Sequence, residues 1–187
     1  MIVNGVDVDK FAGASAPHLT RNMVTLGRFS SNKRLDRLIA LAAALRDETP
    51  QWHLDICGVP ADVSLTALEA EIASHGLEEQ VDVHVGLTTS ALRDVLGRCS
   101  FFVSASEYEG FGLALIEVMS AGLLPVVHHN AAFQAFAAVH PGIDICDFSA
   151  LMRLPRVSQH STVAQRKIWI AFGSKPYPRP APIHGIT

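Results

Sequence analysis

The sequence predicts an α/β domain with a parallel sheet and helices on both of its faces. Short β-type runs alternate with helical patterns along the centre of the 187-residue chain. Alternation at this spacing is typical of right-handed βαβ units. Apolar residues make up 49% of the chain and charged residues 18%, an ordinary globular balance. The formal net charge of −3 lacks the basic excess that a nucleic-acid partner usually requires.

The expected strands are apolar runs rich in β-branched residues, at 23–26, 52–57, 81–85, 101–104 and 124–127. The first is expected to end at Gly27 and the second at Gly58. The longest apolar region, 111–127, is interrupted by Glu117, glycines and a proline, so it does not read as a membrane span.

The expected helices lie at 33–46, 65–75, 90–96 and 113–121, between those strands. Ser30, Ser31 and Asn32 are cap candidates for the first helix, which carries an apolar stripe. Gly76 and Gly122 are placed where left-handed C-caps would end the second and the last.

Three parts of the chain are distinguished. Residues 1–20 are interpreted as the remnant of an interdomain linker, and 21–150 as the ligand-binding domain. Residues 151–187 lose the alternation and end in prolines at 176, 178, 180 and 182, which favour an extended, poorly packed tail. Because the three cysteines form no Cys-x-x-Cys pair, they are expected to be small buried hydrophobic residues.

Ligands of parallel sheets bind at the carboxyl ends of the strands, so the loops that follow the strands contain the candidate site. The first of these loops places Arg28 and Lys33 five residues apart, between a strand and a helix. Arg28 offers a forked contact to phosphate oxygens and Lys33 a point charge. The alternative for this segment alone is a solvated loop with surface cations.

The second candidate element follows the strand at 101–104 and includes Gly110, Phe111, Gly112 and Leu113. The glycines allow close backbone approach, and the helix that begins here would point free amide groups at an anion. Glu109 precedes the glycines, and Glu117 lies about two helical turns further along the chain. Glu117 needs a partner in an otherwise apolar helix: a ribose diol would suit, and neighbouring backbone or a basic side chain is the alternative. Together the two elements fit a nucleoside diphosphate.

The chain resembles the C-terminal domain of glycosyltransferase family 4, which consists of retaining enzymes of the GT-B fold. The resemblance covers about residues 3–128 and depends on Gly27-Arg28, Lys33, Gly58, Gly86 and Glu109-Gly110-Phe111-Gly112-Leu113 with Glu117. It implies a Rossmann-like sheet, the nucleotide-sugar-binding half of such an enzyme, with the acceptor-binding half absent from this chain. Residues 104–127 look most like mannosyltransferases of bacterial exopolysaccharide assembly, which use GDP-mannose and a polyprenyl-diphosphate-linked acceptor.

The resemblance also implies roles for individual residues. Arg28 and Lys33 match the cations that bind the donor diphosphate and stabilise the leaving group. Glu109 matches the carboxylate beside the donor sugar, and Glu117 the one that binds the ribose hydroxyls. The backbone of 110–113 matches the diphosphate and sugar cradle, and the loop after Val85 the base-binding region. The resemblance implies no metal and no other cofactor.

Two departures from the family pattern are visible. In the family a Gly-Gly pair and a Glu usually follow the last strand. This chain has His128-His129-Asn130-Ala131-Ala132-Phe133 there, so the identity of the donor sugar is left open. Neighbours on a strand point to opposite faces, so His128 and His129 are not expected to share a metal. The segment after about Asp147 does not resemble the family's closing helices, and a frameshift or a foreign C-terminus would produce such an ending.

Two functions are compatible with these residues. The chain is either the donor domain of a hexosyltransferase, inactive in isolation, or a non-catalytic nucleotide-sugar-binding module. A dehydrogenase is disfavoured because the first strand is not followed by Gly-x-Gly-x-x-Gly. The expected location is cytoplasmic, and the resemblance allows peripheral contact with the inner face of the plasma membrane. The basic residues of the helix at 33–46 could meet anionic lipid, although a solvated helix face is the favoured interpretation.

Overall fold

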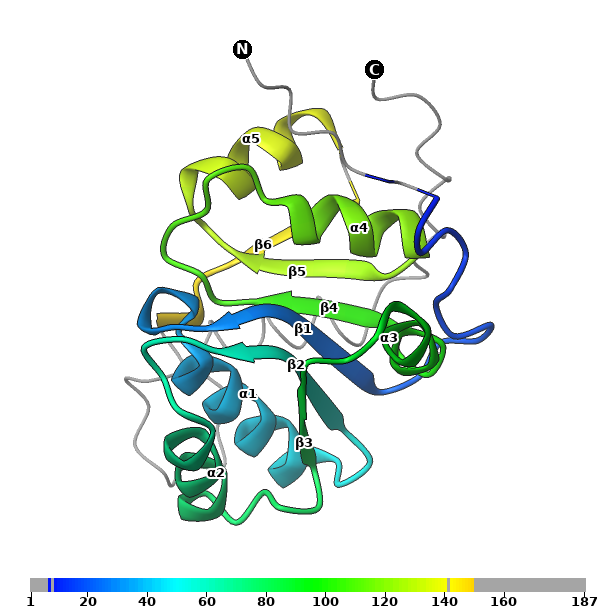
Figure 1. The fold of residues 1–187 in the computed structure, drawn as a ribbon. Coiled ribbons are helices and arrows are strands. Elements are labelled where there is room, and N and C mark those ends of the chain that lie inside the picture. Colours follow the sequence, from blue (N-terminus) through cyan, green and yellow to red (C-terminus); the bar gives the residue numbers. More distant parts are fainter. Residues whose placement is uncertain (1–6, 8, 141, 150–187) are drawn as a thin grey trace.

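The computed structural model describes residues 7, 9–140 and 142–149, which form a six-stranded parallel sheet (Figure 1). The strand order is β3-β2-β1-β4-β5-β6. The strands are β1 (Asn22–Phe29), β2 (His53–Pro60), β3 (Val81–Val85), β4 (Phe101–Ser104), β5 (Leu124–His128) and β6 (Asp144–Cys146). The predicted α/β class and the parallel sheet are confirmed.

Helices cover both faces of the sheet (Figure 1). On one face lie α1 (Leu35–Glu48) and α2 (Leu65–Ser74), and their buried residues form one core cluster with the sheet. On the other face lie α3 (Thr89–Leu96), α4 (Leu113–Ala121) and α5 (Ala131–Val139), which contribute to a second cluster. Successive side chains of β1 point to opposite faces of the sheet, so this strand contributes to both clusters. Met23 and Phe29 belong to the first cluster, and Val24 and Leu26 to the second.

Two strands are longer than the sequence indicated. β1 continues through Gly27 to Phe29, and β2 continues through Gly58 to Pro60, so neither glycine ends its strand. The two glycines are register partners, and a Cβ on Gly58 would lie 1.7 Å from the Gly27 carbonyl oxygen. Glycine therefore serves here to let two backbones approach closely rather than to make a turn.

The first helix also begins differently from the prediction. A 3-10 turn, η1 (Ser31–Lys33), comes first, and Arg34 then adopts a left-handed conformation with φ of 49° before α1 starts at Leu35. The predicted left-handed glycines after α2 and α4 are confirmed, with φ of +61° at Gly76 and +91° at Gly122.

The described part of the N-terminal segment packs against the domain. Phe11 is fully buried in the second core cluster. The amides of Gly13 and Ser15 donate to the carbonyls of Ser120 and Ala121 at the end of α4. This segment is thus held against the α4 side of the sheet (Figure 1).

One carboxylate is fully buried in the sheet. Asp55, in the middle of β2, accepts hydrogen bonds from Arg98 and from His84 Nε2, the latter at 2.7 Å. Burial by itself would raise the pKa of Asp55, but the hydrogen bonds from Arg98 and His84 outweigh it, and the pKa is lowered. Asp55 thereby joins β2, β3 and the turn before β4.

α5 and β6 extend the sheet region beyond the last element that the sequence predicted. The three cysteines are buried, as expected. The tail prediction for 151–187 lies outside the described residues. No helix in the described ranges is long and apolar enough to cross a membrane.

Candidate functional site

The strand order creates a topological switch point at the carboxyl ends of β1 and β4. These neighbouring strands lead to helices on opposite faces, α1 on one and α4 on the other (Figure 1). The loops that follow them therefore diverge, and such a switch point is where parallel α/β sheets bind ligands.

Lys33 and Glu109 meet at this switch point. Lys33 Nζ lies 2.6 Å from Glu109 Oε1, and the two side chains are only 20% and 15% exposed. The stem of Lys33 passes over Gly27, where a Cβ would lie 3.1 Å from Lys33 Cε, and Gly27 has a φ of +145°. Gly27 thus leaves room for Lys33 to reach across β1, and the two candidate elements contact each other through the Lys33–Glu109 pair.

The amino end of α4 opens beside this pair. Gly112 is the N-cap, with a φ of +62°, and the amides of the first helical turn point outward at the positive end of the helix. Gly110 is exposed, Phe111 is 66% exposed and Leu113 40% exposed. Gly112 itself is buried beside Phe133 and Phe136, so an anion would meet this helix end at the exposed residues on either side of Gly112.

Arg28 is exposed near the end of β1. It shares the alternation of Val24 and Leu26, so it lies on the α4 side of the sheet. Nearby, Asp62 accepts hydrogen bonds from the Ser31 hydroxyl and amide, and these bonds, helped by the charge of Arg28, lower the pKa of Asp62.

Glu117 has a basic partner in the structure. Its Oε1 lies 3.3 Å from Lys10 Nζ, and the side chains are 26% and 35% exposed. Lys10 also lies over the ring of Phe11, at 4.7 Å from its centroid. The structure therefore shows the alternative that the sequence left open, a basic side chain, and adds Lys10, which sequence reasoning did not single out.

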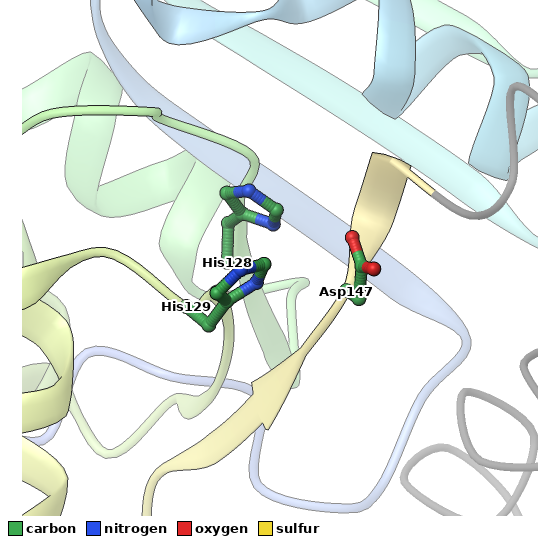
Figure 2. A group of neighbouring side chains, drawn as sticks. All are labelled: His128, His129 and Asp147. Carbon is green, nitrogen blue, oxygen red and sulfur yellow. The ribbon is translucent and has the colours of Figure 1, made fainter.

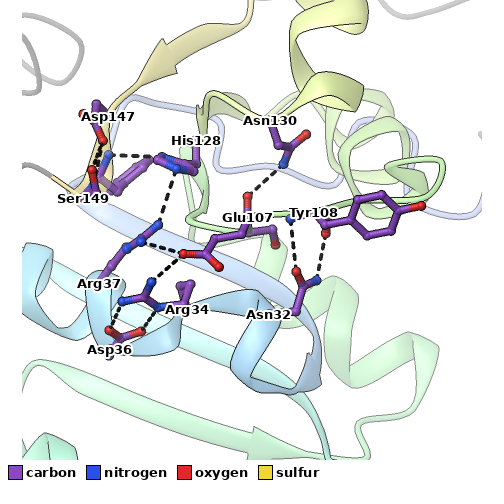
Figure 3. Close-up of polar contacts among 12 residues, drawn as sticks. Asn32, Arg34, Asp36, Arg37, Glu107, Tyr108, His128, Asn130, Asp147 and Ser149 are labelled. Atoms are coloured by element: carbon purple, nitrogen blue, oxygen red, sulfur yellow. Dashed lines mark hydrogen bonds and ion pairs between the residues drawn. The ribbon is translucent and has the colours of Figure 1, made fainter.

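Glu107 joins the loop after β4 to α1, a connection that the sequence did not predict. Arg34 Nη1 and Arg37 Nη2 lie 2.6 and 2.7 Å from Glu107 Oε1 (Figure 3). The hydrogen bond from Arg34 is the main reason that the pKa of Glu107 is lowered. Arg37 is only 7% exposed, so the interpretation of a solvated basic face is wrong for this residue.

His128 and His129 lie together, contrary to the prediction that they point apart. Their ring centroids are 4.3 Å apart, and ligand atoms of both lie within 4.8 Å of one another and of Asp147 (Figure 2). The expectation fails because β5 ends at His128, so strand alternation does not extend to His129.

The donors around His128 nevertheless disfavour a metal. Its Nδ1 accepts the Phe148 amide at 3.3 Å, and its Nε2 lies 3.4 Å from Arg37 Nη1. A metal ligand needs a free lone pair, and both ring nitrogens face N–H groups. Burial, then the neighbouring His129 and Arg37, lower the pKa of His128, so its ring is neutral at neutral pH.

The chain is similar in sequence to known proteins. A family model described as glycosyl transferases group 1 matches residues 11–137. A GDP-mannose:cellobiosyl-diphosphopolyprenol alpha-mannosyltransferase from Xanthomonas oryzae is 39% identical over 138 residues, covering 74% of this chain and 36% of the relative. A protein of the same description from Komagataeibacter xylinus is 34% identical over 132 residues, covering 71% and 34%. The chain thus spans about a third of the length of these curated relatives.

Solved structures support the fold. The C-terminal domain of a glycosyl transferase group 1 family protein (LpcC) from Francisella tularensis has a TM-score of 0.61 at 19% identity, covering 76% of this chain and 80% of that domain. WaaG, a glycosyltransferase involved in lipopolysaccharide biosynthesis, has a TM-score of 0.61 at 16% identity, covering 93% of this chain and 43% of WaaG.

Proposed function

Because the chain belongs to the glycosyl transferases group 1 family, we propose that it is the donor-binding domain of a glycosyltransferase. The observation that carries the proposal is the Lys33–Glu109 pair, which joins the loops after β1 and β4 beside the amino end of α4. This arrangement combines a positive charge, a carboxylate and a backbone anion site in one place.

The proposed ligand is a nucleotide-sugar, and GDP-mannose is the first candidate. Curated relatives at 34–39% identity carry GDP-mannose in their names, and this supports the choice. Arg28, Lys33 and the amides at 111–113 would neutralise the diphosphate, so we propose binding without a divalent metal. Glu109 would lie beside the sugar, and Glu117 would accept the ribose hydroxyls after releasing Lys10.

In the full-length protein we propose retaining transfer of mannose to a lipid-linked acceptor. The bond between the sugar C1 and the diphosphate oxygen breaks, a bond forms between C1 and an acceptor hydroxyl oxygen on the same face of the sugar, and the hydroxyl proton passes to the departing diphosphate. Arg28 and Lys33 stabilise the charge that develops on the nucleoside diphosphate. The acceptor proposal is supported by the relatives' names, which contain a diphosphopolyprenol.

Calorimetric titration of the 187-residue chain with GDP-mannose, UDP-glucose and GDP tests donor binding. The site variant is Arg28→Ala/Glu117→Ala. A matched control is Arg21→Ala/Glu69→Ala, which removes the same charges from exposed positions outside the proposed donor site. We expect one nucleotide-sugar to bind the wild type and the control but not the site variant. Equal binding by the site variant, or none by a folded wild type, would overturn the proposal.

A further inference from the structure

Asn32 bridges two loops of the proposed donor site. In η1, its carbonyl accepts the Glu107 amide at 3.0 Å. Its side chain forms a reciprocal pair with Tyr108: Nδ2 donates to the Tyr108 carbonyl at 2.8 Å, and Oδ1 accepts the Tyr108 amide at 3.1 Å (Figure 3). We call these three bonds the Asn32 bridge. Because the side chain both donates and accepts, it fixes the orientation of the Tyr108 backbone as well as its distance.

The Asn32 bridge lies next to the charged pair on both sides. Lys33 follows Asn32 directly, and Glu109 follows Tyr108 directly. An ion pair between two partly exposed side chains is a weak constraint, because long side chains lose entropy and water screens the charges. The position of Glu109 relative to Lys33 therefore depends on a more rigid constraint. The Asn32 bridge provides it, because its hydrogen bonds lie one residue away from each partner of the ion pair.

Apolar burial does not supply this constraint. The Tyr108 side chain is 70% exposed, and Phe111 is 66% exposed. The loop is instead held by polar contacts from two sides. Opposite Asn32, Asn130 (Figure 3) donates from its Nδ2 to the Ser106 carbonyl at 2.9 Å. Its Oδ1 caps α5 by accepting the Phe133 amide. Asn130 holds the start of the loop, which leaves the Glu107–Tyr108 segment to Asn32 and to the arginines on Glu107.

We propose that Asn32 is a positioning residue for donor binding, an inference that rests on the proposed function. It orients the Glu107–Tyr108 backbone, and through it sets where Glu109 and the amino end of α4 lie relative to Lys33. Asn32 itself need not touch the donor.

The test compares Asn32→Ala and Asn32→Asp with the wild-type chain in two measurements. Asn32→Ala removes both side-chain bonds. Asn32→Asp keeps the shape but replaces the N–H donor with an oxygen that repels the Tyr108 carbonyl. The matched control is Asn22→Ala. Asn22 Nδ2 also donates to a backbone carbonyl, that of Arg98, but Asn22 lies at the start of β1, at the opposite end of the strand from the proposed donor site. Hydrogen–deuterium exchange follows the amides at 105–112, and calorimetry follows the nucleotide-sugar that the wild type binds.

Both Asn32 variants are expected to exchange faster at 105–112 with no change in the core strands. Each should bind the donor roughly tenfold more weakly, as the loss of oriented hydrogen bonds implies. Asn22→Ala should match the wild type in both measurements. Unchanged exchange at 105–112 in the Asn32 variants overturns the inference whether or not a donor binds. A loosened loop with unchanged donor affinity overturns it as well. If the wild type binds no nucleotide-sugar, the proposed function fails, and with it the role in donor binding.

Discussion

Gly58 has no room for a side chain, because its missing Cβ would fall on the Gly27 carbonyl oxygen of the neighbouring strand. A Gly58→Ala substitution must push β1 and β2 apart where they enter the site. We expect it to destabilise the chain by about 3 kcal/mol, at the upper end of overpacking costs. Urea denaturation measures this. Gly142→Ala, where a Cβ would meet nothing within 4 Å, serves as control and should stay close to wild type.

Lys33 should contribute charge to the donor and not stability to the fold. We expect Lys33→Met to weaken nucleotide-sugar binding roughly 10- to 100-fold, the usual cost of losing a hydrogen bond to a charged group. Because Glu109 then loses its partner, a Lys33→Met/Glu109→Gln double variant removes both charges of the pair. The double variant should unfold at the same urea concentration as the wild type, and its affinity for the nucleotide-sugar should stay at least as weak as that of Lys33→Met. Wild-type affinity in the double variant would show that the pair is only structural.

His128 should make stability depend on pH on the acidic side of neutrality. Its pKa is lowered in the folded chain by burial, His129 and Arg37, so the unfolded chain takes up the proton first. The folded state therefore loses stability as the pH falls below about 6.5, the ordinary pKa of histidine, by at most about 1.4 kcal/mol per pH unit.

Denaturation midpoints at pH 7.5 and 5.5 measure this loss, and His128→Gln is the variant to compare. It should flatten the pH dependence, while His129→Gln, at an exposed position, should not. Equal slopes for wild type and His128→Gln would contradict the prediction.

At the scale of elements, Asp55 holds β2 to β3 and to the turn before β4. Removing one partner of a buried ion pair costs about 3–5 kcal/mol, and Asp55→Asn should fall near the lower value because Arg98 can turn to water. The pKa of Asp55 is lowered in the folded chain, so its contribution is complete above the unfolded value of about 3.9 and is lost as the pH falls through the folded value.

Urea unfolding at several pH values below 5 isolates this contribution. Asp55→Asn should lose less stability on acidification than the wild type, while Asp94→Asn, at an exposed position on α3, should follow the wild type. A parallel acid profile for Asp55→Asn would mean that its charge is not what joins these strands.

The sequence was sufficient for the elements that have strong local signals. α4 begins and ends as predicted, because Gly112 and Gly122 mark both of its ends. α5 was missed although Asn130 caps it and its alanines favour a helix. β6, at three residues, is too short to carry a periodicity. Gly58 and Gly27 were assigned to strand ends because a glycine in a sequence does not show which backbone will approach it.

The candidate site was predictable as a meeting of loops but not as a set of pairs. The strand-end rule brings Lys33 and Glu109 together, although they lie 76 positions apart. Lys10 and Glu117 lie 107 positions apart, and Lys10 follows no strand in the described part of the chain, so the strand-end rule could not predict this pair. The Asn32 bridge could not be predicted either, because the sequence indicates Asn32 only as a candidate helix cap.

At the scale of the whole molecule, the chain corresponds to only part of its relatives. It spans about a third of the curated relatives. Transfer requires an acceptor aligned with the donor, and alignment of that kind contributes several kcal/mol, up to ~11 kcal/mol, to lowering a barrier. We therefore expect the 187 residues alone to bind the donor without measurable transfer.

A radiolabelled sugar-transfer assay with a polyprenyl-diphosphate-linked acceptor measures this. The full-length protein, assayed beside the chain, shows whether the acceptor was suitable. Transfer by the chain alone would contradict the prediction, and binding without transfer in the full-length protein would favour a non-catalytic module.

The strand order also determines when the site can come into being during synthesis. β1, β2 and β3 can pair as they leave the ribosome, since each lies beside its predecessor in the sheet. The other edge of β1 stays unpaired until β4 is synthesised, because Phe101 and Phe102 of β4 pair with Met23 and Val24. Until then this edge of β1 has no partner strand, and an unpaired strand edge is a hazard for aggregation in a nascent chain. A donor cannot protect this intermediate, because half of its own binding site has yet to be translated.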